Sequence, residues 1–390
     1  MVQRYGREVF GGAETYARDM ATQLAARGHT VEVLTSCAVT YVDWANHYPE
    51  GSSVLDGVLV HRLPVRRLRE PRVFGPLSSR IVEDPVGVPL HLQREWVRLQ
   101  GPFIPELSTW LADRSLEYDA AIFVTYLYYT TWAGLPAARG PRVFHPTAHD
   151  EWQLNLDVYD RIFHLSDAFG FLTPEEGQLV TKRFGVQRPQ QVTGMGIDLR
   201  RPADPAAFRQ RFGLGDGPYI AYAGRIDTAK GSEELYRYFS EFKRRHPGPL
   251  KLVLIGEEVA RLPARPDVVK TGFVDGAVRD SGLAGAELLV QPSRFESFSI
   301  VLCEAWVAGI PALVQGRSDV LVGQAHRSGG ALPYWTYAEF EAGLELLLAD
   351  AVLRQRMAAA GRAYVEANYA WNEVLSGYET FLERVSRTAS

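Results

Sequence analysis

Strand-length apolar runs alternate with helix-competent segments twice along this chain, and no other feature constrains its fold as much. Parallel strands are joined by crossover helices and covered on both faces, so their sequences are largely continuous apolar runs. The pattern therefore predicts an α/β protein with parallel sheets and helices on both faces. The predicted strands form a first series at 29–36, 57–62, 120–124, 141–144 and 168–172, and a second at 218–224, 250–256, 268–274, 286–291 and 311–315.

The two series indicate two domains. A chain of 390 residues is too long for one ordinary domain. Glycines and a proline interrupt both patterns at 193–202. We expect a Rossmann-like domain over 1–194 and another over 195–370. An amphipathic helix from Trp371 should follow, with an apolar face at Val374, Leu375, Tyr378 and Leu382.

Two carboxylates eight residues apart, Glu296 and Glu304, frame a predicted helix start. Glu296 lies in a loop after the apolar run 286–292. Glu304 falls about one turn inside a helix that Ser299 can cap and Gly309 ends. One carboxylate therefore stands before a helix N-terminus and the other just inside it.

The backbone N–H groups of Phe298, Ser299 and Ile300 lie between these carboxylates. Such groups have no partner within the helix and carry the positive end of its dipole, so a diphosphate could dock there. Carboxylates beside an anion site suit the hydroxyls of a ribose and a sugar. The alternative is two solvated glutamates, since carboxylates are favoured in first helical turns.

This Glu, seven residues, Glu motif and the segment 311–330 resemble the retaining glycosyltransferases of family 4 through most of the chain. The resemblance implies an α/β protein of GT-B fold, with two Rossmann-like domains facing across a cleft. It also implies that the helix at 371–390 packs back on the first domain. The implied activity is transfer of a sugar from a nucleoside-diphosphate sugar to an acceptor hydroxyl, in glycan, polysaccharide or glycolipid synthesis.

Arg225 and Lys230 follow the strand 218–224, where ligands of open α/β sheets bind. Fixed cations there can stabilise the charge that grows on a leaving phosphate. In the family, Arg and Lys at matching positions hold the donor phosphates, and we carry that role to these two residues. The resemblance likewise assigns the ribose to Glu304 and the sugar hydroxyls to Glu296.

The first domain offers two further candidates. Gly12 follows Gly11 before the first helix, without a complete G-x-G-x-x-G fingerprint. The resemblance implies that this loop faces the donor phosphate; the alternative is a tight turn that needs glycine for its backbone only. His149 lies in FHPTAHDE (144–151), which resembles the family's H-D element, whose His approaches the transferred sugar. His145, one turn earlier, is the competing candidate.

Two stretches fit the alternation poorly. The region 65–110 contains six prolines, and we interpret it as an insertion that shapes the acceptor side. Residues 1–6 provide at most the end of a strand, so we expect either a stunted first strand or a true start elsewhere. The base of the donor should be recognised by loops after 252–256 and at 271–275, because both follow strands of the second series.

The composition of the chain limits which metals, cofactors and macromolecules it is expected to bind. No Cys or His cluster has zinc spacing, and the family's donor domain works without a metal, so we expect neither metal nor cofactor beyond the donor substrate. The net charge of −4 gives no pull toward nucleic acid. Only Cys37 and Cys303 are present and no apolar stretch reaches about 18 residues, which indicates a cytoplasmic protein.

The acceptor class stays open among a glycan, a lipid-linked acceptor and a small molecule. The arginine-rich segment 62–72 is either a solvated loop or a patch for an acidic acceptor or an anionic membrane, which leaves peripheral membrane contact open. Two other functions are compatible with the sequence: a nucleotide-sugar epimerase or hydrolase on the same fold, and a non-catalytic nucleotide-sugar-binding partner.

Overall fold

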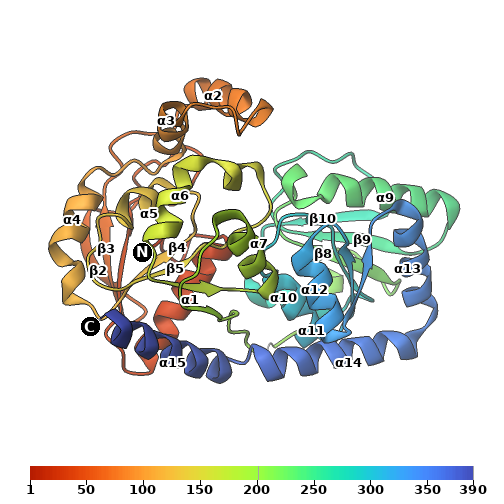
Figure 1. The fold of residues 1–390 in the computed structure, drawn as a ribbon. Helices are drawn as coiled ribbons and strands as arrows, with labels where there is room; N and C mark the ends of the chain where they lie inside the picture. The colour runs from red at the N-terminus through yellow and green to blue at the C-terminus, as the bar shows by residue number, and fades with distance from the viewer. Residues whose placement is uncertain (201, 390) are drawn as a thin grey trace. The chain divides into compact units, whose positions relative to one another are not determined.

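The computed structural model of the chain describes residues 1–200 and 202–389. The chain divides into two compact units. Unit 1 comprises Met1–Gly196 together with the chain from Val374 onward, and unit 2 comprises Ile197–Glu373. Each unit has its own strands and its own core (Figure 1). The predicted α/β class with parallel sheets is confirmed.

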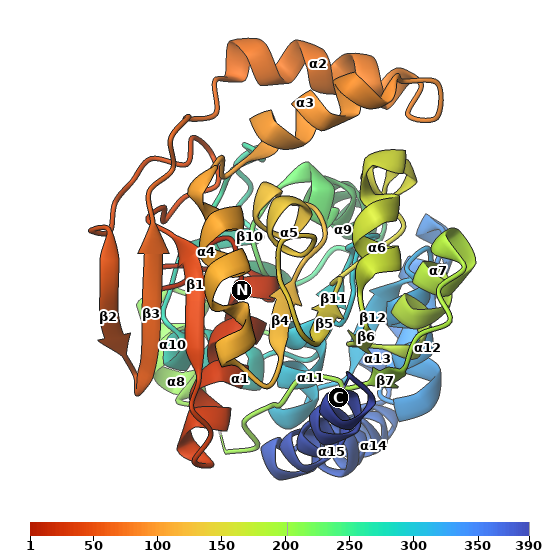
Figure 2. The ribbon, with the colours of Figure 1, turned by 60° about the vertical axis from the view of Figure 1, so that its left-hand side comes forward.

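The strands of unit 1 form two hydrogen-bonded groups, ordered β1-β3-β2 and β4-β5-β6-β7 (Figure 2). Neighbouring strands are parallel except for the antiparallel pair β2–β3. The first residues of the chain lie between the groups: the Val2 N–H donates to Leu34 O at 3.3 Å, and the Val124 N–H donates to Met1 O at 3.0 Å. The strand bounds are β1 Glu32–Ser36, β2 Gly51–Leu55, β3 Val58–Leu63, β4 Ala121–Val124, β5 Arg142–His145, β6 Ala168–Phe171 and β7 Gln190–Val192.

The five predicted strands of the first series correspond to β1, β3, β4, β5 and β6. Two further strands, β2 and β7, were not predicted. The first four residues of β2 are exposed and β7 has no fully buried residue, so neither carries the continuous apolar run of a strand covered on both faces.

The helices of unit 1 pack around these strands. In α1, Tyr16, Met20 and Leu24 are buried at four-residue intervals, which places them on one face of the helix. The proline-rich insertion is helical: α2 begins at Pro71, a favoured first position, and lies with α3 at one end of the unit (Figure 2). The bounds are α1 Gly12–Ala26, α2 Pro71–Glu83, α3 Leu90–Gln100, α4 Glu106–Arg114, α5 Tyr129–Gly134, α6 Asp160–Leu165 and α7 Pro174–Phe184.

The arginine-rich segment helps to pack unit 1. Arg62 is 6 % exposed and donates to Ser53 Oγ at 2.9 Å and to Tyr5 O at 3.1 Å. The guanidinium of Arg69 lies 4.7 Å from the ring centroid of Phe74, and burial lowers its pKa. The solvated-loop interpretation is therefore wrong for Arg62 and Arg69. These two arginines are also not available to a surface patch that would bind an acidic acceptor or an anionic membrane.

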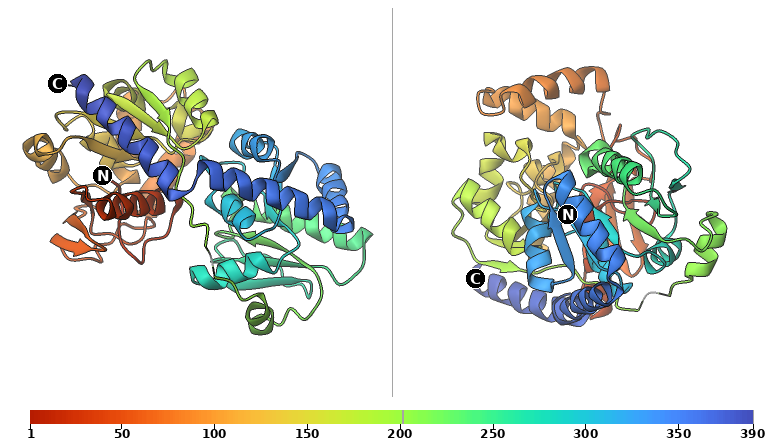
Figure 3. Two further views of the ribbon diagram at one scale, coloured as in Figure 1. Left: turned by 90° about the horizontal axis from the view of Figure 1, so that it is seen from below. Right: turned by 90° about the vertical axis from the view of Figure 1, so that its right-hand side faces the viewer.

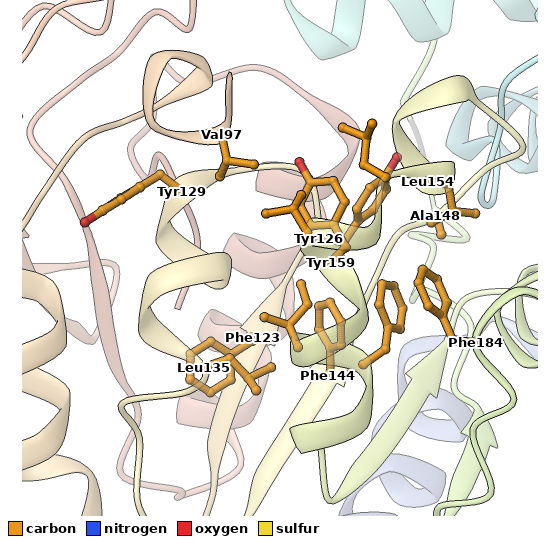
Figure 4. Close-up of a cluster of buried hydrophobic side chains, with 14 of the residues drawn as sticks. Val97, Phe123, Tyr126, Tyr129, Leu135, Phe144, Ala148, Leu154, Tyr159 and Phe184 are labelled. Atoms are coloured by element: carbon orange, nitrogen blue, oxygen red, sulfur yellow. The ribbon is translucent and has the colours of Figure 1, made fainter. Parts of the chain in front are cut away.

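Aromatic side chains fill the core of unit 1 between β4–β6 and the helices α6 and α7 (Figure 4). Phe163 and Phe184 stack with centroids 3.7 Å apart, and Tyr126 meets Tyr159 edge-on at 5.0 Å. Dense aromatic packing of this kind leaves little freedom to the strand ends it covers. It therefore fixes the loops that leave β4 and β5.

Unit 2 is built on one sheet of order β10-β9-β8-β11-β12-β13, in which every neighbouring pair is parallel. Five of these strands were predicted; β13, which holds Pro333 and is only partly buried, was missed. Because all the strands of this sheet are parallel, their carboxyl ends lie at one edge of the sheet. The strand bounds are β8 Tyr219–Ala223, β9 Lys251–Ile255, β10 Val268–Gly272, β11 Leu289–Gln291, β12 Ala312–Gln315 and β13 Ala331–Tyr334.

Helices cover the sheet of unit 2 (Figure 1). One core cluster joins Phe239 of α9 and Phe340 of α13 to Ile220 and Leu252 of the strands. The helix α11 contacts α10, α14 and the strand β11. The bounds are α8 Pro205–Arg211, α9 Ser232–Arg245, α10 Gly276–Ala284, α11 Ile300–Val307, α12 Asp319–Ser328, α13 Tyr337–Ala349 and α14 Ala351–Asn368.

The last helix, α15 (Trp371–Ala389), packs on unit 1 from Val374 onward (Figure 3). Its buried face carries Val374, Leu375, Tyr378, Phe381 and Val385, whereas the predicted Leu382 is half-buried. The Tyr378 hydroxyl lies 2.9 Å from His145 Nε2, and Glu379 Oε2 lies 2.7 Å from Arg27 Nη1. A buried hydrogen bond and a surface ion pair thus hold neighbouring residues of the helix.

These two contacts should differ in strength. We expect Tyr378→Phe to lower the free energy of unfolding of unit 1 by about 1–3 kcal/mol, because it leaves a buried ring nitrogen without its partner. Glu379→Gln should cost at most about 1 kcal/mol, because exposed ion pairs contribute little. Denaturant titration of both variants tests the order; a larger loss for Glu379→Gln would contradict the buried bond.

Candidate active site

The loops after β8 and β11 meet at the carboxyl edge of the sheet in unit 2. Gly231, at φ 73°, ends the loop after β8, and a Cβ atom there would lie 2.3 Å from Pro292 O. Only glycine tolerates both the backbone conformation and this approach. The approach brings Lys230 Nζ to 2.9 Å from Glu296 Oε1, with the two side chains 38 % and 11 % exposed. The structure thus joins two predicted site residues that lie far apart in the sequence.

Asp227 organises the cations of this loop. Its carboxylate accepts the Lys230 backbone N–H at 2.9 Å and pairs with the Arg225 guanidinium. The Arg225 carbonyl in turn accepts from Tyr222 Oη at 2.6 Å. Asp227 was not predicted as a site residue, although an Asp two residues after Arg225 and before a turn is a recognisable signal.

The helix α11 starts at Ile300, with Ser299 in the N-cap position. Ser299 adopts φ 70° and ψ 76°, a left-handed conformation that is uncommon outside glycine. Its hydroxyl does not cap the helix, contrary to the prediction, because it accepts a hydrogen bond from Gln291 Nε2 at 3.0 Å. The first backbone N–H groups of α11 are therefore left without a side-chain cap and can serve an external anion.

The turn before α11 is held from both sides by buried glutamines. Gln291 ends β11 and bonds the Ser299 hydroxyl, whereas Gln324 of α12 donates to the carbonyl oxygen of Phe298. The Phe298 ring packs edge-on against Tyr369 at 4.8 Å. Phe298 is thus a buried anchor, and any contact with a ligand would come from its backbone.

Glu304 lies in the second turn of α11 and is 5 % exposed at its side chain. Its Oε1 accepts from Arg279 Nη2 of α10 at 2.7 Å. A buried carboxylate needs such a partner. No local pattern in the sequence points to Arg279, which lies 25 residues away.

The two glycines of unit 1 differ in what surrounds them. A Cβ atom at Gly11 would lie 2.3 Å from Glu14 Oε2, whereas at Gly12 no atom lies within 4 Å. Glu14 is held in place by Gln3 at 2.8 Å and by an ion pair with Arg4. Gly11 is therefore needed for packing, and Gly12 leaves open space at the start of α1.

The two histidines after β5 have different environments. His145 is fully buried, with Nδ1 3.1 Å from Tyr16 Oη and Nε2 2.9 Å from Tyr378 Oη. Burial lowers its pKa to about 3, so its ring stays neutral. His149 is 28 % exposed at its side chain, with Nδ1 3.3 Å from Glu151 Oε1. His145 is therefore a structural residue, and His149 is the one that a ligand can reach.

Within the described residues, no three His, Cys, Asp or Glu side chains gather as a metal site. Nor is any helix in that part of the chain long and apolar enough to cross a membrane. The candidate site of unit 2 thus combines three cation–carboxylate pairs with the N-terminus of α11. These groups can hold a diphosphate and the hydroxyl groups beside it.

Comparison with known proteins points to the same chemistry. Residues 10–201 match the family described as "Glycosyltransferase Family 4", and residues 205–364 match "Glycosyl transferases group 1". The D-inositol 3-phosphate glycosyltransferase of Nocardia farcinica is 24 % identical over 94 % of this chain and 83 % of its own length. The alpha-D-kanosaminyltransferase of Streptomyces kanamyceticus is 31 % identical over 47 % of this chain and 51 % of its own length.

Solved structures agree in fold. Sucrose-phosphate synthase from Thermosynechococcus elongatus superimposes with a TM-score of 0.73 at 18 % identity, over 100 % of this chain and 99 % of that one. Anabaena HepE in complex with UDP gives a TM-score of 0.69 at 16 % identity, over 98 % and 99 %. These neighbours confirm the GT-B fold. The chain therefore belongs to the GT4-type glycosyltransferases of GT-B fold.

Proposed function

We propose that this chain is a retaining glycosyltransferase that moves a hexose-like sugar from a nucleoside-diphosphate sugar to an acceptor hydroxyl. The observation that carries the proposal is the contact between Lys230 and Glu296 beside the uncapped start of α11. This contact supports the proposal, because a cation suited to a phosphate lies beside a carboxylate suited to sugar hydroxyls. The complex of Anabaena HepE with UDP supports a nucleotide donor.

In this proposal the bond between the sugar C1 and the β-phosphate oxygen breaks while the acceptor oxygen bonds C1 on the same face. The departing phosphate takes the acceptor's proton. Arg225 and Lys230 stabilise the charge that grows on this phosphate, together with the backbone N–H groups of Ser299 and Ile300. Glu304 holds the ribose, and Glu296 exchanges Lys230 for sugar hydroxyls.

In unit 1, we assign the donor phosphate to the backbone at Gly12. We assign the transferred sugar to the imidazole of His149. The charge stabilisation needs no metal ion, because both cations are fixed side chains. We expect a cytoplasmic reaction, since both cysteines are buried free thiols. The acceptor is a glycan, a lipid-linked acceptor or a small molecule, and the names of the two relatives favour the last.

Donor turnover with and without candidate acceptors tests the proposal. A thermal-shift screen of UDP, GDP, dTDP and ADP first identifies the base, because a ligand at about 100 times its Kd adds about 2.7 kcal/mol. Nucleotide release that acceptors stimulate supports glycosyl transfer. Acceptor-independent turnover would instead indicate an epimerase or hydrolase, and binding without turnover a non-catalytic partner.

Glu304→Gln should weaken donor binding about 10- to 100-fold, because a hydrogen bond to a charged group contributes about 1.5–3 kcal/mol. Calorimetry with the identified nucleotide measures the change. Arg279→Gln is the control, since it removes one internal partner of Glu304 and keeps the carboxylate. If both variants melt earlier and bind the nucleotide like the wild type, Glu304 serves the fold and not the ribose.

Arg225→Ala and Lys230→Ala should each lower kcat about 100-fold and weaken donor binding less, because the phosphate charge grows in the transition state. Their combined effect should fall short of the product of the two, since both face one group. Lys251→Ala is the matched control, because Lys251 begins β9 at the opposite edge and bonds Leu214 O at 2.9 Å.

Steady-state kinetics and ligand titration separate the two effects. Wild-type kcat in either variant would remove that residue from the site. Full activity after treatment with EDTA is required by the metal-free mechanism, and a loss that Mg²⁺ restores would contradict it.

A further inference from the structure

A buried carboxylate of unit 1, Glu176, holds the loop that carries His149. Glu176 lies in the first turn of α7 and is 1 % exposed. Its Oε1 accepts the Ala148 N–H at 2.8 Å, and its Oε2 accepts the Leu172 N–H at 2.7 Å. One carboxylate therefore joins the loop after β5 to the loop after β6, and Ala148 is the residue directly before His149.

The helix α7 does not need Glu176 as its N-terminal cap. Thr173 already caps α7 by accepting the Glu176 N–H at 3.3 Å. A carboxylate in a first turn is favourable when solvated, whereas full burial is costly without several hydrogen bonds. Burial raises the pKa of Glu176 to about 8, and the N–H groups of Leu172, Ala148 and Thr147 oppose that shift. The N–H groups of two loops thus offset part of the cost of burial.

The loop after β5 has a strained backbone at Thr147, directly before the residue whose N–H group Glu176 binds. Thr147 adopts φ 49°, in the left-handed region that β-branched residues rarely occupy. The preceding residues are fixed from β4, because the Thr125 N–H donates to His145 O at 2.8 Å and the Tyr126 N–H donates to Pro146 O at 3.0 Å. The left-handed turn at Thr147 therefore lies between the fixed end of β5 and the N–H group of Ala148 that Glu176 binds.

Beyond this turn, His149 is held by a second carboxylate. Glu151 Oε1 lies 3.3 Å from His149 Nδ1 and accepts the Tyr126 hydroxyl at 2.6 Å. The Glu151 N–H also donates to His149 O at 2.8 Å. Glu151 can orient the imidazole, whereas the turn at Thr147 sets the path by which the backbone reaches His149.

We propose that Glu176 is a positioning residue for His149: its carboxylate stabilises the left-handed turn at Thr147 and thereby sets the place of the imidazole. The inference rests on the proposed function, in which His149 approaches the transferred sugar. It adds a residue that touches no substrate and acts through the backbone of its neighbours.

Glu176→Gln tests this role with little change in volume. The amide keeps one acceptor and turns a donor toward an N–H group, so one of the two loops is released. We expect kcat to fall about 10- to 100-fold, as for a misplacement of about 1 Å, with the KM for the donor nearly unchanged. A loss of this size in Glu176→Gln together with wild-type-like kcat in His149→Ala would overturn the proposal, because Glu176 would then act elsewhere.

A rescue experiment separates positioning from general loss of stability. Glycine adopts the left-handed conformation without strain. Thr147→Gly in the Glu176→Gln background should therefore restore at least about tenfold of the lost kcat. Thr125→Gly is the matched control: Thr125 is also left-handed, at φ 64°, and also follows a strand end, but Glu176 does not bond it. Rescue by both glycines alike, or by neither, would overturn the proposal.

The outcome also separates this inference from the function on which it rests. If the wild type transfers sugar and His149→Ala is impaired while Glu176→Gln is not, the function stands and the positioning role fails. If the wild type turns over none of the donors, the proposed function fails. The positioning role is then judged by the imidazole NMR signals of His149, which Glu176→Gln should shift and Thr147→Gly should return.

Discussion

The parallel arrangement of the sheet in unit 2 is the constraint on which its site depends. Because every strand runs the same way, the loops after β8 and β11 open at one edge, and a glycine at position 231 lets them touch. The contact between Lys230 and Glu296 follows from this geometry together with the opposite charges of the two side chains. The same principle applies to unit 1, where the loops after β4, β5 and β6 are tied together by Glu176 and by backbone bonds from Thr125 and Tyr126.

Much of this fold could be predicted from the sequence, because buried parallel strands leave a continuous apolar run. The ten predicted strands are all present. The strands that were missed are those without such a run: β2 at an exposed edge, β7 with polar residues, and β13 with Pro333. The insertion was recognised by its prolines but not as helical, since Pro71 begins a helix and Pro76 lies inside one. Proline statistics describe average helices, and here packing of Trp96 and Ile81 in the core outweighs them.

The sequence could nominate residues for the candidate site but not their partners. Glu296, Glu304, Arg225 and Lys230 stand beside recognisable strand and helix ends, and the family resemblance assigned their roles, which stay predictions. Their partners are set by tertiary structure: Arg279 reaches Glu304 from another helix, and Gln291 takes the hydroxyl that was expected to cap α11. The two histidines also show that tertiary environment cannot be predicted from spacing. Spacing could not separate His145 from His149, whereas burial between Tyr16 and Tyr378 distinguishes them.

The ion pairs of the site bear on how a donor would bind. Lys230 with Glu296, and Arg279 with Glu304, keep each buried or half-buried carboxylate compensated. A diphosphate that draws Lys230 away would leave Glu296 with unmet hydrogen-bonding capacity, which the hydroxyl groups of a bound sugar could satisfy. A nucleoside diphosphate without its sugar would break the same contact and leave that capacity to water. In the proposed mechanism, the pair would therefore couple phosphate binding to sugar recognition, and the hydrogen bonds that Glu296 regains would favour the complete donor over its product.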